Sequence, residues 1–514
     1  MGDGLDASLK PELVSKAAFL YASTIASAVF SYIALFFATR FVGDTGYGIL
    51  AFALSFSGVF LFITDFGLGT SHIKKVSEGE DLQSCLSVFL FIRLALVGAF
   101  ATIVLSALFL WQDILGQGFE TADTQLVILI ILLYYVQSSI TYVFTQTFLA
   151  QRDVVRAQAI ALADVASRAI ATLLVIALNW GIVGLACTYA VEGFVALAVA
   201  LFLARGRLPK IRLSAVKRAL VKQYARFAAP IAVTGIFGTV ALYGDKILIQ
   251  YSSIDSAETG IYFACQRVLS FYLVLSPVIA SVAYPAFSQL NAQKQGRETI
   301  SMMTTSMIRY LLLATIPIMF FLVAFSGDIL SIFLSSSFAA GATAFAILAV
   351  GYSIGLTISP FGSQILGMGM SGTYGKYMMI STIAMIALDV ILIPSNLFSI
   401  PLAGWGMNGA AVSLLVGSVI LAVLFYSNAK KLLQLKAPKG MIATACAAIS
   451  AITPVYALSI YVELSRFYDL IAVFFLYAGI FIAFAVLFRA ISVNEIKDML
   501  KMVRQKNMIH RPHK

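Results

Sequence analysis

The chain has 514 residues, of which 60% are hydrophobic and only 11% are charged, and its mean hydropathy is +0.93. Soluble globular domains carry about 25% charged residues, so this composition excludes a soluble protein and indicates a polytopic membrane protein. The net charge of +11 could mark a nucleic-acid partner, a membrane surface or a topology signal, depending on where the basic residues lie.

Apolar runs long enough to cross a membrane follow one another along the whole chain. A spanning helix needs roughly 20 apolar residues, and Gly, Pro and charged residues separate the runs. The predicted spans are 17–38, 48–66, 85–110, 126–150, 156–178, 181–204, 227–251, 258–284, 304–325, 339–358, 375–394, 406–427, 441–462 and 467–489. We therefore expect an all-α polytopic membrane protein with about 14 transmembrane helices.

The basic residues alternate with these spans. Most of the 35 Lys and Arg residues lie in the tails and in every second connection, on the side of the N-terminus. Arg40 and Arg466 are the basic residues of the connections on the other side. The positive-inside rule then places both termini in the cytoplasm of a multi-pass cell-membrane protein, and the basic excess is a topology signal rather than a nucleic-acid footprint.

The spans and charges divide the chain into segments, beginning with a tail that lacks the features of a cleaved secretory signal. We predict a cytoplasmic tail (1–16), an N-lobe (17–204), a basic cytoplasmic linker (205–226), a C-lobe (227–427), a basic cytoplasmic loop (428–440), a last helix pair (441–489) and a basic cytoplasmic tail (490–514). The linker is the strongest basic cluster. It is either an amphipathic segment attracted to anionic head groups or a marker of orientation alone.

Two short patterns recur and indicate an internal duplication. The repeated residues are Asp164-Val165 with Asp389-Val390, Trp180-Gly181-x-x-Gly184 with Trp405-Gly406-x-x-Gly409, and Thr45-Gly46 with Thr259-Gly260. Since six spans is an even number, both copies would enter the membrane from the same side. We expect two parallel six-helix repeats around a central cavity, which rocking would open alternately to either side, plus a C-terminal helix pair.

No cofactor or metal site is expected. The four cysteines lie in apolar runs without CxxC spacing, and the three histidines are His72, expected in a loop, and His510 and His513 in the tail. A GxxxxGK[ST] phosphate-binding loop is lacking. The short outer connections and the absence of a buried histidine disfavour a membrane-embedded glycan enzyme.

Charged residues inside the predicted spans are the candidate functional residues, because a charge near the bilayer centre costs at least about 2.5–3.5 kcal/mol unless it is paired or faces water. The cations are candidates for binding an anionic substrate: Arg93, Arg168, Lys246 and Arg267. The acids are candidates for coupling to an ion: Asp164, Glu192, Asp245 and Asp389. The number of interior cations favours an anionic substrate.

Each of these residues also has an ordinary interpretation. Asp164 and Arg168 are spaced i, i+4, so they form either a structural ion pair or a cation with its own counter-ion facing a cavity. Arg267 lies near mid-membrane and would hold an anionic group or pair with Asp245. Lys246 could instead extend its amine to the membrane surface.

Three further candidates, Arg93, Glu192 and Asp389, also have an alternative interpretation. Arg93 is deep in the third span, although its long side chain could reach the inner head groups. Glu192 and Asp389 would couple transport to an ion, or neutralise a neighbouring arginine.

Several motifs together resemble a known family. They are Arg40-Phe-Val-Gly-Asp-Thr-Gly-Tyr-Gly48, Asp65-Phe-Gly-Leu-Gly69, Asp245-Lys246-Ile-Leu-Ile, Gly260-Ile-Tyr262 and Tyr284-Pro285. Their order along the chain resembles the polysaccharide transporter (Wzx-type flippase) branch of the multidrug/oligosaccharidyl-lipid/polysaccharide exporter superfamily.

The resemblance implies a flippase, and not an enzyme, that moves polyprenyl-phosphate- or pyrophosphate-linked oligosaccharides to the outer leaflet. By analogy with the lipid II flippases, Arg267 and Arg40 would face the cavity, with Arg93 and Arg168 as further candidates. The alternative is a multidrug/cation antiporter of the same superfamily, in which Glu192 or Asp245 would exchange protons or sodium. Those relatives usually have twelve spans, so the last helix pair counts against this alternative.

Overall fold

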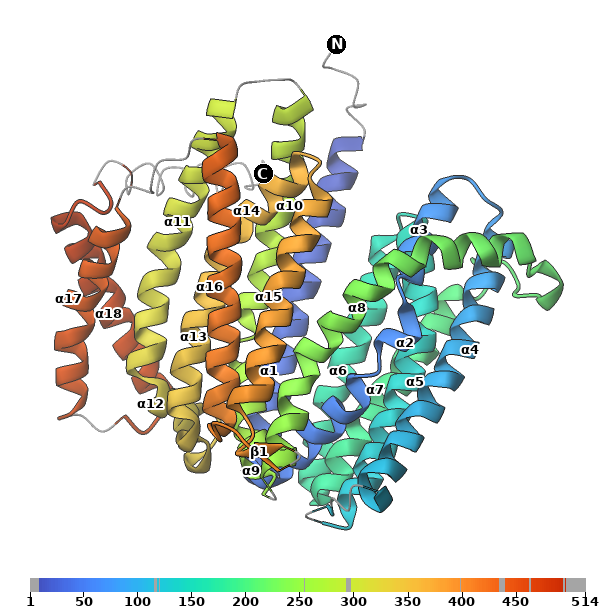
Figure 1. The fold of residues 1–514 in the computed structure, drawn as a ribbon, viewed down its shortest axis with the longest axis horizontal. Helices are drawn as coiled ribbons and strands as arrows, with labels where there is room; N and C mark the ends of the chain where they lie inside the picture. Colours follow the sequence, from blue (N-terminus) through green and yellow to red (C-terminus); the bar gives the residue numbers. More distant parts are fainter. Residues whose placement is uncertain are drawn as a thin grey trace, which may run out of the picture. The chain divides into compact units, whose positions relative to one another are not determined.

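The computed structural model describes residues 9–114, 118–119, 121–253, 255–292, 297–397, 399–433, 440–461, 464–492 and 495, and it divides into two compact units (Figure 1). Unit 1 comprises residues Met1–Val268 and Thr382–Ala410, and unit 2 comprises Leu269–Ser381 and Ala411–Lys514. The first half of the predicted tail 1–16, residues 434–439 of the loop 428–440 and nearly all of the tail 490–514 lie outside the described residues.

Almost all described residues of both units are helical. Unit 1 contains α1 (Leu9–Gly58), α2 (Phe62–Asp65), α3 (Leu68–Ser77), α4 (Leu82–Phe109), α5 (Asp123–Ala150), α6 (Val154–Leu178), α7 (Gly181–Ala204), α8 (Arg218–Ser252) and α9 (Ala257–Val268). Unit 2 contains α10 (Phe271–Ala292), α11 (Arg297–Ala324), α12 (Ser326–Phe333), α13 (Ala342–Thr357), α14 (Ser359–Gly367), α17 (Met441–Ser459) and α18 (Phe467–Leu487).

Two further helices, α15 (Ser371–Leu392) and α16 (Gly406–Leu433), contribute residues to both units. Between them, β1 (Asn396–Leu397) and β2 (Ile400–Pro401) form a small antiparallel hairpin with Asn396 opposite Pro401. Short π-helical and 3₁₀ turns occur at Leu110–Ile114, Leu213–Ala215 and Ser336–Gly341.

Twelve stretches among the described residues are long and apolar enough to cross a membrane. One of them, Ala22–Ser77, covers both the first and the second predicted span, and α8, which holds the seventh, is not among the twelve. The chain is therefore an all-α polytopic membrane protein, as its composition predicts, with twelve candidate spans in the described part.

The first two predicted spans are two helical stretches of α1 that meet at a kink. The kink lies at Gly43, between the predicted spans 17–38 and 48–66, and the φ of 69° at this residue lies in the left-handed region that favours glycine. The chain then turns at Phe66 and Gly67, which have φ values of 45° and 79°, before α3 begins.

Two glycines, Gly48 just after the first copy of the Thr-Gly pattern and Gly260 in the second copy, bring α1 and α9 together. A Cβ atom on Gly48 would lie 1.8 Å from the carbonyl oxygen of Ser256, and a Cβ atom on Gly260 would lie 2.1 Å from that of Asp44. Only glycine allows backbones to approach so closely. Tyr47 extends this contact by packing its ring 5.6 Å from that of Phe263.

The repeated Trp-Gly pattern forms the tight connection that precedes a spanning helix in both of its copies. Asn179 and Gly181, with φ values of 52° and 64°, link α6 to α7, and Gly404 and Gly406, at 66° and 51°, precede α16. The Glu258 carboxylate on α9 accepts a hydrogen bond of 2.7 Å from the backbone N–H of Met407 and so caps the first turn of α16.

The last two predicted spans, 441–462 and 467–489, correspond to α17 and α18, which pack on α11 in unit 2 (Figure 1). Buried aromatic rings hold them there, with Phe321 on α11 and Phe325 just after it in the same core cluster as Tyr477 on α18. The Tyr477 hydroxyl donates a hydrogen bond of 3.1 Å to the carbonyl of Pro317 on α11.

Candidate functional site

All nine predicted site residues lie in unit 1. They are distributed over seven helices: Arg40 on α1, Arg93 on α4, Asp164 and Arg168 on α6, Glu192 on α7, Asp245 and Lys246 on α8, Arg267 on α9, and Asp389 on α15. Five are buried (Arg93, Glu192, Asp245, Lys246 and Asp389), Asp164 and Arg168 are partly buried, and Arg40 and Arg267 are exposed.

Arg168 pairs across helices rather than within its own. Its guanidinium lies 3.4 Å from the carboxylate of Glu192 on α7, and above the ring of Tyr189 at 5.1 Å. The i, i+4 neighbour Asp164 is not within ion-pair distance, because α7 packs closely on α6 and offers a buried carboxylate. The positive charge of Arg168 is therefore compensated inside the protein.

Glu192 is the centre of a wider group of charges. Besides Arg168, both Asp164 and Arg267 lie within electrostatic range of its carboxylate. Tyr47, from the glycine-rich pattern of α1, lies within range of the same two arginines. The close approach of α1 and α9 thus brings Arg267 toward the α6–α7 ion pair.

Lys246 forms the most buried ion pair of the unit. Its side chain is about 2% exposed, and its ammonium lies 2.8 Å from the Asp245 carboxylate and 2.6 Å from the carbonyl of Leu242. Gln266 on α9 donates a hydrogen bond of 3.1 Å to the second carboxylate oxygen of Asp245 and another of 3.1 Å to the Tyr262 hydroxyl. Asp245 and Lys246 are adjacent on α8, but both are buried together because the lysine side chain is long enough to fold back toward the Asp245 carboxylate.

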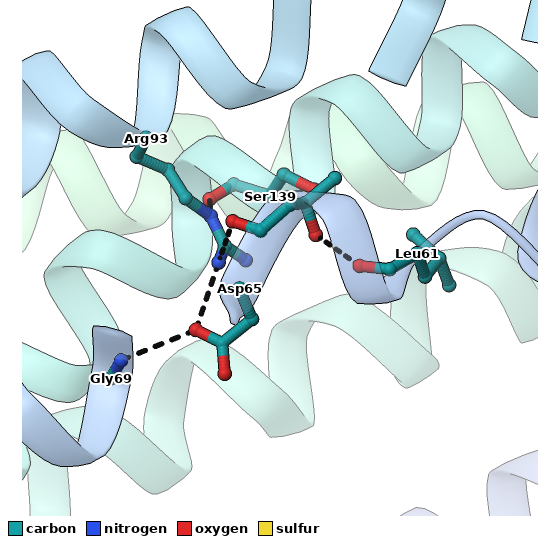
Figure 2. A network of polar contacts seen from close by, with 6 residues as sticks. Leu61, Asp65, Gly69, Arg93 and Ser139 are labelled. Carbon is teal, nitrogen blue, oxygen red and sulfur yellow. Dashed lines mark hydrogen bonds and ion pairs between the residues drawn. The ribbon is translucent and has the colours of Figure 1, made fainter. Parts of the chain in front are cut away.

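Arg93 holds the break between α2 and α3, as Figure 2 shows. It donates hydrogen bonds to the carbonyls of Thr64 (2.5 Å) and Ser139 (3.1 Å) and forms an ion pair of 3.0 Å with Asp65. The same Asp65 oxygen accepts the backbone N–H of Gly69 at 3.2 Å and so caps the start of α3. These contacts use three of the five N–H groups of Arg93 and give the Asp65–Gly69 motif a structural role.

Arg40 and Arg267 differ from the other three cations by being exposed. Each lies over the ring of a phenylalanine one helical turn earlier, Arg40 at 4.5 Å from Phe36 and Arg267 at 4.7 Å from Phe263. A guanidinium over an aromatic face is attracted by the negative face of the ring. An exposed guanidinium is also suited to binding a phosphate group with two parallel hydrogen bonds.

Sequence reasoning missed several polar partners in this region. Gln266 and Tyr262 complete the Asp245–Lys246 pair, and the buried side-chain oxygen of Gln137 lies next to Gly193, one residue after Glu192. Asp65 on α2 is a further partner, through its ion pair with Arg93. A glutamine within an apolar run, such as Gln137 or Gln266, is the signal that could have found two of these residues.

The histidine prediction needs a correction. His72 is not in a loop but in α3, where it is fully buried and hydrogen-bonded to the hydroxyls of Tyr224 (2.9 Å) and Thr147 (3.0 Å). Its ring stacks on Phe89 at 4.6 Å. In the part of the chain that the structure describes, no three His, Cys, Asp or Glu side chains gather in a way that could hold a metal ion.

The sequence is similar to known proteins over part of its length. A family model described as "Polysaccharide biosynthesis protein" matches residues 13–291, more than half of the chain. A stretch of 204 residues is 25% identical to the "Probable low-salt glycan biosynthesis flippase Agl15" of Haloferax volcanii. That match covers 39% of this chain and only 40% of the relative's length.

Solved structures are similar over a larger share of the chain. The inward closed conformation of the lipid II flippase MurJ has a TM-score of 0.70 at 13% identity, and covers 92% of this chain and 98% of its own. An inward-facing multidrug resistance MATE family transporter of the MOP superfamily has a TM-score of 0.65 at 12% identity, with coverage of 80% and 96%. Because the sequence identities are only 13% and 12%, these similarities show a shared fold and nothing further.

Proposed function

This chain belongs to the polysaccharide biosynthesis protein family, with the fold shared by MurJ and the MATE transporters, and we propose that it flips lipid-linked oligosaccharides across the cytoplasmic membrane. The membership confirms the resemblance seen in the motifs, and it makes the chain a membrane transporter of polysaccharide biosynthesis and not an enzyme. The proposed cargo is an oligosaccharide or polysaccharide repeat unit on a polyprenyl phosphate or pyrophosphate, destined for cell-surface glycans.

The observation that carries the proposal is the different exposure of the five candidate cations. Arg93 and Lys246 are buried and Arg168 is partly buried, whereas Arg40 and Arg267 are exposed with their guanidinium groups over phenylalanine rings. A hydrated path that holds the phosphate at such arginines would let the sugar head group cross while the lipid tail stays in the bilayer. We assign phosphate binding first to Arg267 and Arg40.

Arg168 is the next candidate for contact with the phosphate, because it is only partly buried and shares the electrostatic environment of Glu192 with Arg267. Arg93 and Lys246 are better suited to positioning, since their charges are already compensated by Asp65 and Asp245. We expect substitution of Arg93 or Lys246 to lower the stability of the fold more than it lowers substrate binding.

The carboxylates are proposed as the coupling groups. Glu192 and Asp245 are each shared between a cation and a second polar group, and Asp164 and Asp389 occupy matching positions in the recurring pattern. A proton or a sodium ion that binds at one of these acids would weaken its ion pair with the neighbouring cation. Such a change would link the ion to the movement of the helices that carry the pair.

Alternating access is the proposed mechanism, with two six-span repeats, about fourteen spans in all and both termini in the cytoplasm. The contact of α1 with α9 supports a duplicated architecture, because the segments that carry the two copies of the Thr-Gly pattern pack on each other at Gly260 and at Gly48, two residues after the first copy. The lobes 17–204 and 227–427 would then move against each other while the helix pair 441–489 stays with the second lobe.

A multidrug/cation antiporter remains the second candidate, and the buried carboxylates Glu192 and Asp245 are the observation that favours it. Such a transporter would bind a cationic substrate at these acids. The cations paired with them, Arg168 and Lys246, count against this function because they neutralise the acids before a substrate arrives.

The leaflet distribution of lipid-linked oligosaccharide in cells that lack the protein tests the proposed function. We expect the lipid-linked oligosaccharide to accumulate facing the cytoplasm, with surface glycan lost, and the wild-type gene to restore both. Unchanged lipid pools together with increased sensitivity to cationic drugs would instead support the antiporter.

A further inference from the structure

The chain between α7 and α8, together with the first turns of α8, is rich in exposed cations. Residues 205–226, called here the basic surface, contain eight basic residues and no acidic residue: Arg205, Arg207, Lys210, Arg212, Lys217, Arg218, Lys222 and Arg226. All eight side chains are exposed. The proposed transport route uses none of them.

The apolar side chains of the same segment face the protein. Leu220 and Tyr224 are buried in a core cluster with residues of α3, α4 and α5, and Val216 and Val221 pack against that cluster. The Tyr224 hydroxyl is hydrogen-bonded to buried His72 on α3, which lies beside the start of α8 (Figure 1). A free amphipathic helix would insert its apolar face into the bilayer, but here that face is already occupied by protein.

The backbone of the basic surface is also fixed in place. The Gln83 side chain at the start of α4 donates a hydrogen bond of 2.8 Å to the carbonyl of Lys210, and the Ser87 hydroxyl accepts the N–H of Arg212 at 3.2 Å. These contacts anchor the extended part of the segment to α4. The direction in which its cations point is therefore set by the fold.

On α8, the cations form a stripe opposite the buried face. Arg218, Lys222 and Arg226 follow one another at four-residue intervals, which places them along one side of the helix. Leu220 and Tyr224 follow the same interval on the other side. The helix thus presents three positive charges outward from a rigid support.

Within the described part of the chain, these charges are not compensated by ion pairs. Across the described ranges, none of the eight cations lies within 4.0 Å of a carboxylate oxygen. Asp81 is the nearby acid; its pKa is held below the ordinary value chiefly by hydrogen bonds from Ser84, with a small contribution from Lys217. A surface of uncompensated charge of one sign attracts ions of the opposite sign.

We propose that the basic surface binds the head groups of anionic phospholipids in the inner leaflet. Phe202, near the end of α7, is 77% exposed in an apolar span, which places the neighbouring Arg205 at the edge of the hydrocarbon. The eight cations are spread along the segment instead of converging on one point, which suits a layer of head groups better than a single phosphate. The inference rests on the cytoplasmic orientation that we propose for the linker.

The test measures lipid binding to the purified full-length protein by native mass spectrometry, with phosphatidylglycerol and phosphatidylcholine as probes. The variant Arg218→Gln/Lys222→Gln/Arg226→Gln removes the stripe on α8. A cation near an anionic surface contributes about a fivefold factor in binding, so we expect its affinity for phosphatidylglycerol to fall at least about tenfold. Its affinity for phosphatidylcholine should not change.

Two control variants complete the experiment. Arg152→Gln/Lys430→Gln/Lys431→Gln removes three exposed cations from other predicted cytoplasmic connections and should lower the affinity less than twofold. Arg218→Lys/Lys222→Arg/Arg226→Lys keeps the charge and should bind phosphatidylglycerol like the wild type, which separates loss of charge from misfolding.

Two outcomes would overturn the inference. Equal losses of affinity in the stripe variant and in the Arg152/Lys430/Lys431 variant would mean that only total charge matters. A loss of affinity for a polyprenyl phosphate probe, with phosphatidylglycerol binding unchanged, would assign the surface to the substrate. Because this measurement involves no transport, its failure would leave the proposed flippase function standing.

Discussion

Two groups of cations in unit 1 differ in how their positive charge is compensated. Inside the helices, Lys246, Arg168 and Arg93 each lie within 3.4 Å of a carboxylate, whereas the eight cations of the basic surface are exposed and have no such partner among the residues that the structure describes. Removing an ion from water costs several kcal/mol, so an interior cation needs a partner. At the surface, water or lipid head groups supply the compensation, and the charge remains available for binding.

This difference predicts where a substitution damages the fold and where it damages binding. Loss of one partner of a buried pair leaves the other charge without compensation. Loss of an exposed cation changes the surface charge and leaves the packing intact. Asp245→Ala and Arg93→Gln test this division, and Gly260→Ala gives a comparison in which packing changes but no charge does; the three follow from the largest expected loss of stability to the smallest.

Asp245→Ala should have the largest effect. It removes the carboxylate that lies 2.8 Å from the Lys246 ammonium, whose side chain is about 2% exposed. We expect the free energy of unfolding to fall by about 3–5 kcal/mol, measured by unfolding of the purified protein in detergent. The double variant Asp245→Ala/Lys246→Met should recover much of this loss, and a double variant as unstable as the single one would contradict the argument.

Gly260→Ala should destabilise by about 1–3 kcal/mol, because its Cβ atom would lie 2.1 Å from the carbonyl oxygen of Asp44 and 2.6 Å from the backbone nitrogen of Gly48. Backbone atoms cannot move aside as a flexible side chain can. Gly98→Ala in α4 is the matched control, since nothing lies within 4 Å of that position. Equal thermal stability of the two variants would show that the α1–α9 contact can relax.

Arg93→Gln should destabilise by about 1–3 kcal/mol, since it leaves the carbonyls of Thr64 and Ser139 without their donor. Asp65 is less affected because its side chain is 36% exposed and keeps the N–H of Gly69. Asp65→Asn should therefore cost less than Arg93→Gln in the same unfolding measurement. The reverse order would mean that the carboxylate, and not the arginine, organises the break between α2 and α3.

The sequence was sufficient for the helical class, the apolar runs and the residues that carry charge. Hydropathy depends on composition over about 20 residues, which is enough to find the two spans on either side of Gly43 but not the form of their connection, a kink at one glycine. His72 was misplaced for a similar reason, because a short helix rich in polar residues has no clear apolar signature.

The pairing of charges could not be predicted because it depends on how helices pack. The i, i+4 rule offered Asp164 as the partner of Arg168, yet the carboxylate that reaches it is Glu192, 24 residues away on another helix. Asp65 and Arg93 are 28 residues apart and meet only because the chain bends between α2 and α3. Local spacing gives the candidates, and tertiary packing selects among them.

The central claim is that the exposed arginines bind the phosphate while the buried ion pairs maintain the fold. The most direct test compares Arg267→Gln with the wild type in binding of a polyprenyl phosphate and in the unfolding midpoint, both on purified protein. We predict at least a tenfold loss of affinity, corresponding to about 1.4 kcal/mol, with the midpoint unchanged. Unchanged affinity, or a loss of affinity that merely follows a loss of stability, would contradict the account.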